Sequence, residues 1–125
     1  MNVLVVDASA LGALVFGEPE AERISDMLSG APLVAPALLP YELASICLKK
    51  IKAHPAKQAL LFEAFELAGK LAIEYVDVDH KQVITLAKDK GLTTYDATYL
   101  WLARETGGRL VTLDAVLRKA MRSVI

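Results

Sequence analysis

Four acidic residues stand out in this sequence of 125 residues because each lies where the interior of a protein is expected. Asp7 ends the apolar run at residues 3–6, and Asp114 ends a second apolar run at residues 110–113. Glu42 and Asp96 each fall within a mostly apolar helical pattern, on the side expected to face inward. Because inward-facing carboxylates repel one another, something positive is expected between them, and a divalent metal ion is the natural candidate.

The types of these residues predict which metal they would bind. A set of oxygen ligands without Cys or His favours Mg²⁺ or Mn²⁺ over zinc. Such ions use one or two direct carboxylates and keep several waters, and substrate phosphates complete the coordination shell. The matching chemistry is phosphodiester hydrolysis, in which a metal-bound water attacks in line and the metal stabilises the leaving oxygen. The sequence leaves open whether one ion or two would bind.

Helix capping is a competing explanation for three of the four acids. Asp7, Asp96 and Asp114 all lie near expected helix starts, where Asp is a favoured cap worth ~1 kcal/mol. Taken singly, each is better explained as a cap than as a ligand. Glu42 is different, because its neighbours at i−4, i−3 and i+4 are all apolar and share its helical face. A carboxylate buried there without a partner costs several kcal/mol, so Glu42 favours a common metal site.

The elements that must position these acids alternate along the chain. The pattern of apolar residues, Gly, Pro and capping residues predicts strands at 2–6, 33–35, 73–78 and 109–113, and helices at 8–15, between Pro19 and Gly30, and at 38–54, 55–67, 80–90, 95–106 and 114–122. Thr94 is the expected cap of the helix at 95–106. Strands that alternate with helices indicate βαβ units and a mostly parallel sheet covered on both faces, here in a single domain spanning residues 1–125.

This arrangement brings two of the acids to one edge of the sheet. In open parallel sheets, ligands bind beyond the carboxyl ends of the strands. Asp7 and Asp114 both follow a strand at that edge. If the two strands are neighbours, both carboxylates can reach the same ion.

Composition excludes several classes of protein. A hydrophobic fraction of 54% and a mean hydropathy of +0.38 argue against disorder, yet no apolar stretch is long enough to span a bilayer. The N-terminus lacks the basic region of a signal peptide, so we expect a soluble, cytoplasmic protein. Cys47 is the only cysteine, which excludes an internal disulfide and a cysteine-based zinc site. The net charge of −1 argues against a strongly cationic nucleic-acid binder.

Four short motifs in the order seen here resemble those of PIN-domain nucleases, and within that group of VapC-type toxins of bacterial and archaeal toxin–antitoxin pairs. The resemblance runs nearly end to end, and its carriers are Val5-Val6-Asp7-Ala8-Ser9, Pro40-Tyr41-Glu42-Leu43, Thr94-Tyr95-Asp96-Ala97-Thr98-Tyr99-Leu100 and Leu110-Val111-Thr112-Leu113-Asp114. Each motif is weak alone, but four at these separations are fairly specific for the family.

The resemblance implies an α/β fold of three layers, a PIN-like central sheet of four to five mostly parallel strands flanked by helices. It implies RNA cleavage that depends on Mg²⁺ or Mn²⁺, a homodimer, and an antitoxin whose C-terminal tail covers the active site. Carried over by position, the catalytic and metal-binding acids are Asp7, Glu42, Asp96 and Asp114, with Ser9 and Thr112 as hydroxyls that bind water or a carboxylate. Only eleven residues follow Asp114, so a fifth strand is an open question.

Two other functions remain open from the sequence. One is a catalytically silent PIN-fold module that binds another protein, and a less favoured one is a phospho-acceptor receiver domain, which shares the length and the α/β class. His54 and His80 could serve as an acid–base pair, but both are expected to be exposed and are set aside.

Several aromatic and apolar residues lie in helices. Tyr99 and Trp101 are expected in core or dimer packing rather than in base stacking. The apolar residues at 60–65 nearly encircle their helix, which fits a dimer or antitoxin surface as well as simple burial.

Overall fold

The computed structural model describes residues 2–122, and its centre is a parallel sheet with the strand order β3-β2-β1-β4. The strands are β1 (Leu4–Val6), β2 (Leu33–Ala35), β3 (Ile73–Tyr75) and β4 (Arg109–Val111). β1 pairs with both β2 and β4, so the strands that precede Asp7 and Asp114 are neighbours. The two acids therefore follow adjacent strands at the carboxyl edge of the sheet, as the sequence predicts.

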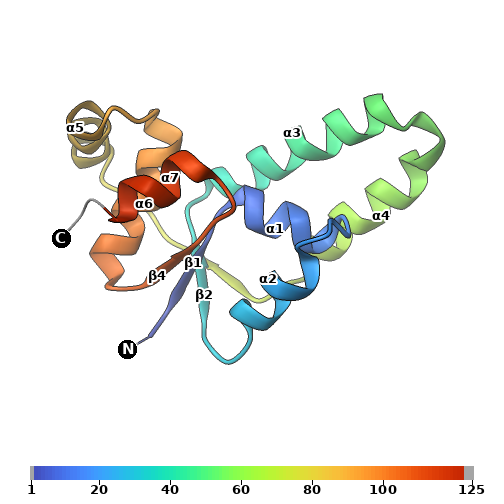
Figure 1. The fold of residues 1–125 in the computed structure, drawn as a ribbon, viewed down its shortest axis with the longest axis horizontal. Helices are drawn as coiled ribbons and strands as arrows, with labels where there is room; N and C mark the ends of the chain where they lie inside the picture. The colour runs from blue at the N-terminus through green and yellow to red at the C-terminus, as the bar shows by residue number, and fades with distance from the viewer. Residues whose placement is uncertain (1, 123–125) are drawn as a thin grey trace.

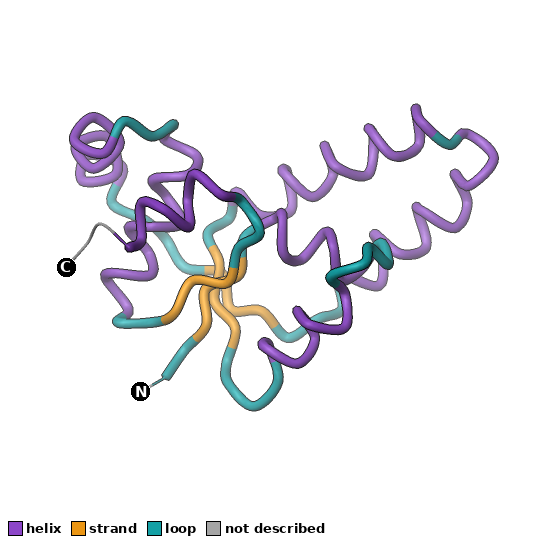
Figure 2. The backbone as a smooth tube through the Cα atoms, in the orientation of Figure 1, coloured by secondary structure: helices purple, strands orange, loops and turns teal. Residues whose placement is uncertain are grey.

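Helices cover both faces of the sheet, which Figure 2 shows as a central group of strands between two groups of helices. They are α1 (Ala8–Val15), α2 (Ala21–Leu28), α3 (Leu38–Ala53), α4 (Gln58–Ala68), α5 (His80–Lys90), α6 (Thr94–Thr106) and α7 (Ala115–Arg122), with a short 3₁₀ helix, η1 (Pro55–Lys57), before α4.

Alternation along the strands creates two separate cores. Val5, Val34 and Leu110 face α5, α6 and α7 in one hydrophobic cluster. Leu4 and Val6 face the other way, in a cluster with residues of α1 to α4. Successive side chains of a strand point to opposite faces, so short runs of apolar residues supply both cores. The predicted three-layer α/β fold is confirmed.

α3 and α4 form a pair of helices that extends away from the sheet, which we call the arm (Figure 1). Lys50, in the last turn of α3, forms an ion pair with Glu18 of the α1–α2 connection. The two helices of the arm expose the large apolar residues Leu48, Leu60, Phe62 and Leu67. Within residues 2–122, no helix is long and apolar enough to cross a membrane.

The structure corrects several predicted boundaries. The third strand ends at Tyr75, not at residue 78, and the fourth ends at Val111, not at residue 113. β4 ends at Val111 because the backbone groups that follow form hydrogen bonds with side chains instead of with a neighbouring strand. Leu113 N donates to Ser9 Oγ, and Thr112 O accepts from Arg118. The helix predicted at 55–67 begins as η1, and α4 starts only at Gln58.

Two further expectations concern a helix cap and a fifth strand. Thr93, not Thr94, caps α6, since its hydroxyl accepts from Asp96 N. The sequence left a fifth strand open: residues 115–122 form α7 and contribute no strand, and residues 123–125 lie outside the described part of the chain.

Candidate active site

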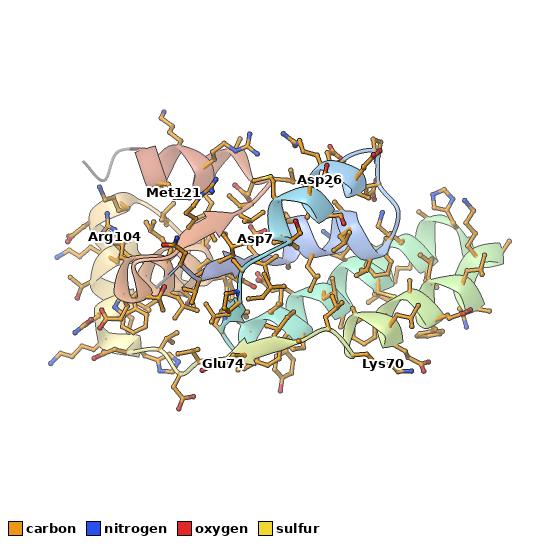
Figure 3. All side chains as sticks on the ribbon, turned by 90° about the horizontal axis from the view of Figure 1, so that it is seen from below. Asp7, Asp26, Lys70, Glu74, Arg104 and Met121 are labelled. Carbon is orange, nitrogen blue, oxygen red and sulfur yellow. The ribbon has the colours of Figure 1, made fainter. Side chains whose placement is uncertain are left out.

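Asp7 is the most buried of the four acids, with 5% of its surface exposed, and lies near the middle of the molecule in Figure 3. It follows β1 directly and caps α1, because its Oδ1 accepts from Ala10 N at 3.0 Å. The same oxygen accepts from Ser9 Oγ at 2.7 Å, and Thr112 Oγ1 donates to Oδ2. Both carboxylate oxygens are thus oriented by the protein before any ligand arrives.

Ser9 and Thr112 act as one unit behind Asp7. Ser9 Oγ accepts from Leu113 N at 2.9 Å, and Thr112 Oγ1 accepts from Asp114 N at 3.0 Å. The two hydroxyls therefore join the end of β4 to the start of α1 while each donates to the Asp7 carboxylate. This geometry agrees with the expected role of both residues as hydroxyls that bind a carboxylate.

Glu42 lies half-buried in α3, on the side of the helix that faces the cavity. Its Oε1 accepts a hydrogen bond of 2.7 Å from the hydroxyl of Tyr99, which belongs to α6. Tyr99 itself is only 2% exposed. A buried tyrosine thus fixes the position of Glu42 from the opposite helix.

Helix capping explains the position of Asp114 but not that of Asp96. Asp114 caps α7, because its Oδ1 accepts from Val116 N at 2.8 Å and from Leu117 N at 3.1 Å. Asp96 lies in the first turn of α6, but Thr93 provides the cap there. Capping therefore accounts for Asp7 and Asp114 and leaves Asp96, like Glu42, without that explanation.

All four acids line one cavity of about 660 Å³ at the carboxyl edge of the sheet. The acids come from the β1–α1 connection, α3, α6 and the β4–α7 connection, so the fold brings together residues as distant as Asp7 and Asp114. Ser9 lines the same cavity, whereas Thr112 supports Asp7 from behind it. The other lining residues are Ala8, Leu38, Tyr41, Ser45, Ile46, Lys49, Tyr95 and Tyr99.

The cavity disfavours negative charge in its empty form. Burial is the main cause that raises the pKa of Asp7, Glu42 and Asp96 above their ordinary values. Mutual repulsion adds to it, since Asp7 and Asp96 raise the pKa of Glu42, and Asp114 raises the pKa of Asp7 and Asp96. The hydrogen bonds from Thr112, Ala10 and Ser9 favour ionised Asp7 and offset part of this effect.

Within residues 2–122, no salt bridge joins a basic side chain to any of the four acids, although Lys49 lines the same cavity. Across the described part of the chain, the salt bridge found is between Lys50 and Glu18, outside the cavity. In the same residues, no group of three or more Asp, Glu, His or Cys side chains is already arranged to hold a metal ion together. The residues fit a hard divalent cation by their chemistry, because carboxylate oxygens are the ligands that Mg²⁺ and Mn²⁺ prefer, and such ions take one or two carboxylates directly and complete their shell with water.

Sequence reasoning missed several residues of the cavity. Tyr99 was assigned to packing, and it is buried, but its hydroxyl also binds Glu42. The available signal was the i, i+3 spacing of Asp96 and Tyr99, which places both on one face of α6. Tyr41, Tyr95 and Lys49 also line the cavity and were not predicted. Neither His54 nor His80 is among the residues that line it.

Comparisons with known proteins agree with this architecture. The family model of the PIN domain matches residues 4–122. Ribonuclease VapC3 of Pyrobaculum aerophilum is 32% identical over 127 residues, an alignment that covers 98% of this chain and 97% of the relative. The crystal structure of PAE2754 from the same organism shares the fold with a TM-score of 0.78 at 24% identity, covering 97% of this chain and 81% of that one. These likenesses give no support to a phospho-acceptor receiver domain, and the chain belongs to the PIN-domain family.

Proposed function

We propose that this protein is a metal-dependent endoribonuclease that hydrolyses RNA phosphodiester bonds as the toxin of a toxin–antitoxin pair. One observation carries the proposal: Asp7 is buried at the end of β1, beside three other acids that share its cavity and have no cationic partner in residues 2–122. The name of the relative, Ribonuclease VapC3, supports RNA as the substrate.

In this proposal the four acids have graded roles. Asp7 is the central ligand of Mg²⁺ or Mn²⁺, because both of its oxygens are already oriented. Glu42, Asp96 and Asp114 bind the ion directly or through water from the other walls of the cavity. The bound metal supplies an activated water and stabilises the leaving oxygen. Ser9 and Thr112 orient Asp7, and Tyr99 orients Glu42 through the hydrogen bond from its hydroxyl.

The proposal includes the partners that the family resemblance implies. These are a homodimer, and a cognate antitoxin whose C-terminal tail covers the cavity, in the cytoplasm. The exposed apolar residues of the arm support a protein partner, because Leu48 and Phe62 line an apolar groove between α3 and α4. Clustered apolar side chains of this kind typically mark an interaction surface.

RNA cleavage by the purified protein in Mn²⁺ or Mg²⁺ tests the proposal. We expect cleavage of single-stranded RNA that stops in excess EDTA and falls at least ~100-fold in Asp7→Asn, since even outer-shell partners of a metal contribute about 10–100-fold. Asp26→Asn in α2 is the matched control, because Asp26 is exposed and does not line the cavity. Undiminished cleavage in EDTA would overturn the proposal. Metal binding without any cleavage would favour the catalytically silent binding module.

A further inference from the structure

Two tyrosines expose their rings at the cavity that holds the four acids. Tyr41 is 75% exposed and Tyr95 is 60% exposed, and both line this cavity. Each directly precedes one of the acids, Glu42 in α3 and Asp96 in α6. Two large aromatic faces, one from each helix, are therefore presented to whatever enters the cavity.

The other two tyrosines of the chain provide a comparison. Tyr99 is buried and uses its hydroxyl to hold Glu42. Tyr75 is 48% exposed, but it lies on the edge strand β3 and is not among the residues that line the cavity. Exposure alone thus does not distinguish Tyr41 and Tyr95, whereas their shared position beside the acids does.

One face of α3 continues the surface beyond Tyr41. Tyr41, Ser45 and Lys49 follow one another at intervals of four residues, and all three line the cavity. At 1.5 Å per residue, the strip from Tyr41 to Lys49 is about 12 Å long. Lys49 is the one cationic residue among those that line the cavity and is exposed. The strip therefore offers an aromatic ring, a hydroxyl and an ammonium group in sequence.

Phosphate contacts of the protein itself supply little affinity for RNA at this cavity. Without metal, the four carboxylates repel the backbone, and the protein has a net charge of −1, so the usual gain from neutralised phosphates is small. Stacking on aromatic rings does not depend on charge and accepts any base. Bases are available for such stacking in single-stranded loops, bulges and ends, but not in a duplex.

We propose that Tyr41 and Tyr95 stack on unpaired bases that flank the scissile phosphate, while Lys49 binds a backbone phosphate farther along α3. This inference rests on the proposed function and assigns the residues that position its single-stranded RNA substrate. Tyr41 and Tyr95 determine where the strand lies, and the acids bind the metal that acts on it.

Equilibrium binding separates this inference from the activity. The probe is a fluorescein-labelled single-stranded RNA of about 12 nucleotides, followed by anisotropy in EDTA, where no cleavage is expected. Tyr41→Leu and Tyr95→Leu should each weaken binding between about fivefold and about 150-fold, the range measured for loss of one stacked base. Tyr41→Phe and Tyr95→Phe keep the ring and should bind within about twofold of the wild type. Tyr75→Leu is the matched control and should change nothing.

Two further binding measurements test the preference for unpaired bases and the role of Lys49. The reference value is the weak affinity of the Tyr41→Leu/Tyr95→Leu double variant for the intact single strand. The wild type should show an equally weak affinity for a duplex of the same sequence and for a strand with abasic positions at the cleavage site. Lys49→Met should lower the slope of log affinity against log salt by about 0.7, the value for one phosphate of a single strand.

The outcomes distinguish the two proposals. Equal binding by the leucine and phenylalanine variants, equal binding of duplex and single strand, or no binding by the wild type would overturn the stacking inference. Absence of cleavage in Mn²⁺ by a wild type that binds RNA through these tyrosines would overturn the proposed function alone.

Discussion

The two ends of α3 differ in what they bury and what they expose. Near its start, the helix carries Glu42, a half-buried carboxylate, between the fully packed Leu39 and Leu43. Toward its end, the helix carries the exposed Leu48, which lines an apolar groove with Phe62 of α4. One end thus withdraws charge from water, and the other leaves apolar surface in water.

Both arrangements cost free energy in an isolated domain. Burying a carboxylate without a counter-charge is unfavourable, and so is exposing large apolar side chains. In the proposed function, a different ligand removes each cost: a cation at the start of the helix and an apolar partner at its end. The contrast teaches that one helix can serve chemistry and association in separate segments. Changes at one end should therefore leave the function of the other end intact.

The largest effect that we expect in this comparison is at Tyr99. Tyr99→Phe removes the hydroxyl that donates to Glu42 Oε1 and keeps the ring in the core. Because this hydrogen bond lowers the pKa of Glu42, its loss should raise that pKa further. We expect kcat/KM for RNA cleavage to fall by about 10–100-fold and its pH profile to move to higher pH.

Tyr75→Phe is the control for this substitution, since Tyr75 is exposed on β3 and lines no part of the cavity. A Tyr99→Phe enzyme with the wild-type rate and pH profile would show that the tyrosine serves packing alone.

A second prediction concerns stability and pH in the metal-free protein. The folded state raises the pKa of Asp7 above its ordinary value of 3.8, mainly through burial, so the folded protein binds more protons than the unfolded chain above that pH. The free energy of unfolding should therefore fall as pH rises from about 3.8 through the raised pKa, and the loss persists at neutral pH. Asp7→Asn should reduce this loss, which urea unfolding in EDTA at several pH values measures.

Metal should reverse the ranking of the two proteins. Mn²⁺ at 100 times its Kd should stabilise the wild type by ~2.7 kcal/mol at neutral pH, and Asp7→Asn much less. Equal stabilisation of both proteins by Mn²⁺ would contradict the place of Asp7 at the centre of the site.

The smallest effect on cleavage is expected at the exposed apolar residues of the arm, which do not line the cavity. Leu48→Asp and Leu60→Asp place charge on exposed apolar positions, so the free energy of unfolding should change by no more than about 0.5 kcal/mol. Cleavage per active site should match the wild type, whereas light scattering should show loss of self-association or of antitoxin binding. Ile84→Asp, at an exposed position of α5, is the control. A Leu48→Asp or Leu60→Asp variant that still self-associates and binds the antitoxin but no longer cleaves RNA would contradict the separate roles of the two ends of α3.

Much of the acidic cavity was predictable because its positions follow from simple rules. Asp7 and Asp114 end apolar runs, and parallel strands place their carboxyl ends at one edge. Glu42 could be placed on the inner side of its helix from the spacing of its apolar neighbours alone. These predictions depend on local periodicity and topology, and the structure places all of these acids at one cavity.

The contacts made across the fold were not predictable. The hydrogen bond between Tyr99 and Glu42 joins residues 57 positions apart and depends on how α6 packs opposite α3. The ends of β3 and β4 were also misplaced, because Val76 and Leu113 continue the apolar patterns although the chain has left the sheet. The extension of the arm away from the sheet was not predictable from the sequence. An apolar helix has the same residue pattern whether it packs against the core of its own domain or against another protein.

Calorimetric titration of Mn²⁺ into the metal-free protein is the sharpest test of a metal site centred on Asp7, because it requires neither RNA nor a partner. We expect saturable binding that weakens as pH falls, since the carboxylates must ionise, and that is at least ~10-fold weaker in Asp7→Asn while Asp26→Asn is unchanged. No binding by the wild type, or equal binding by the wild type and Asp7→Asn, would contradict it.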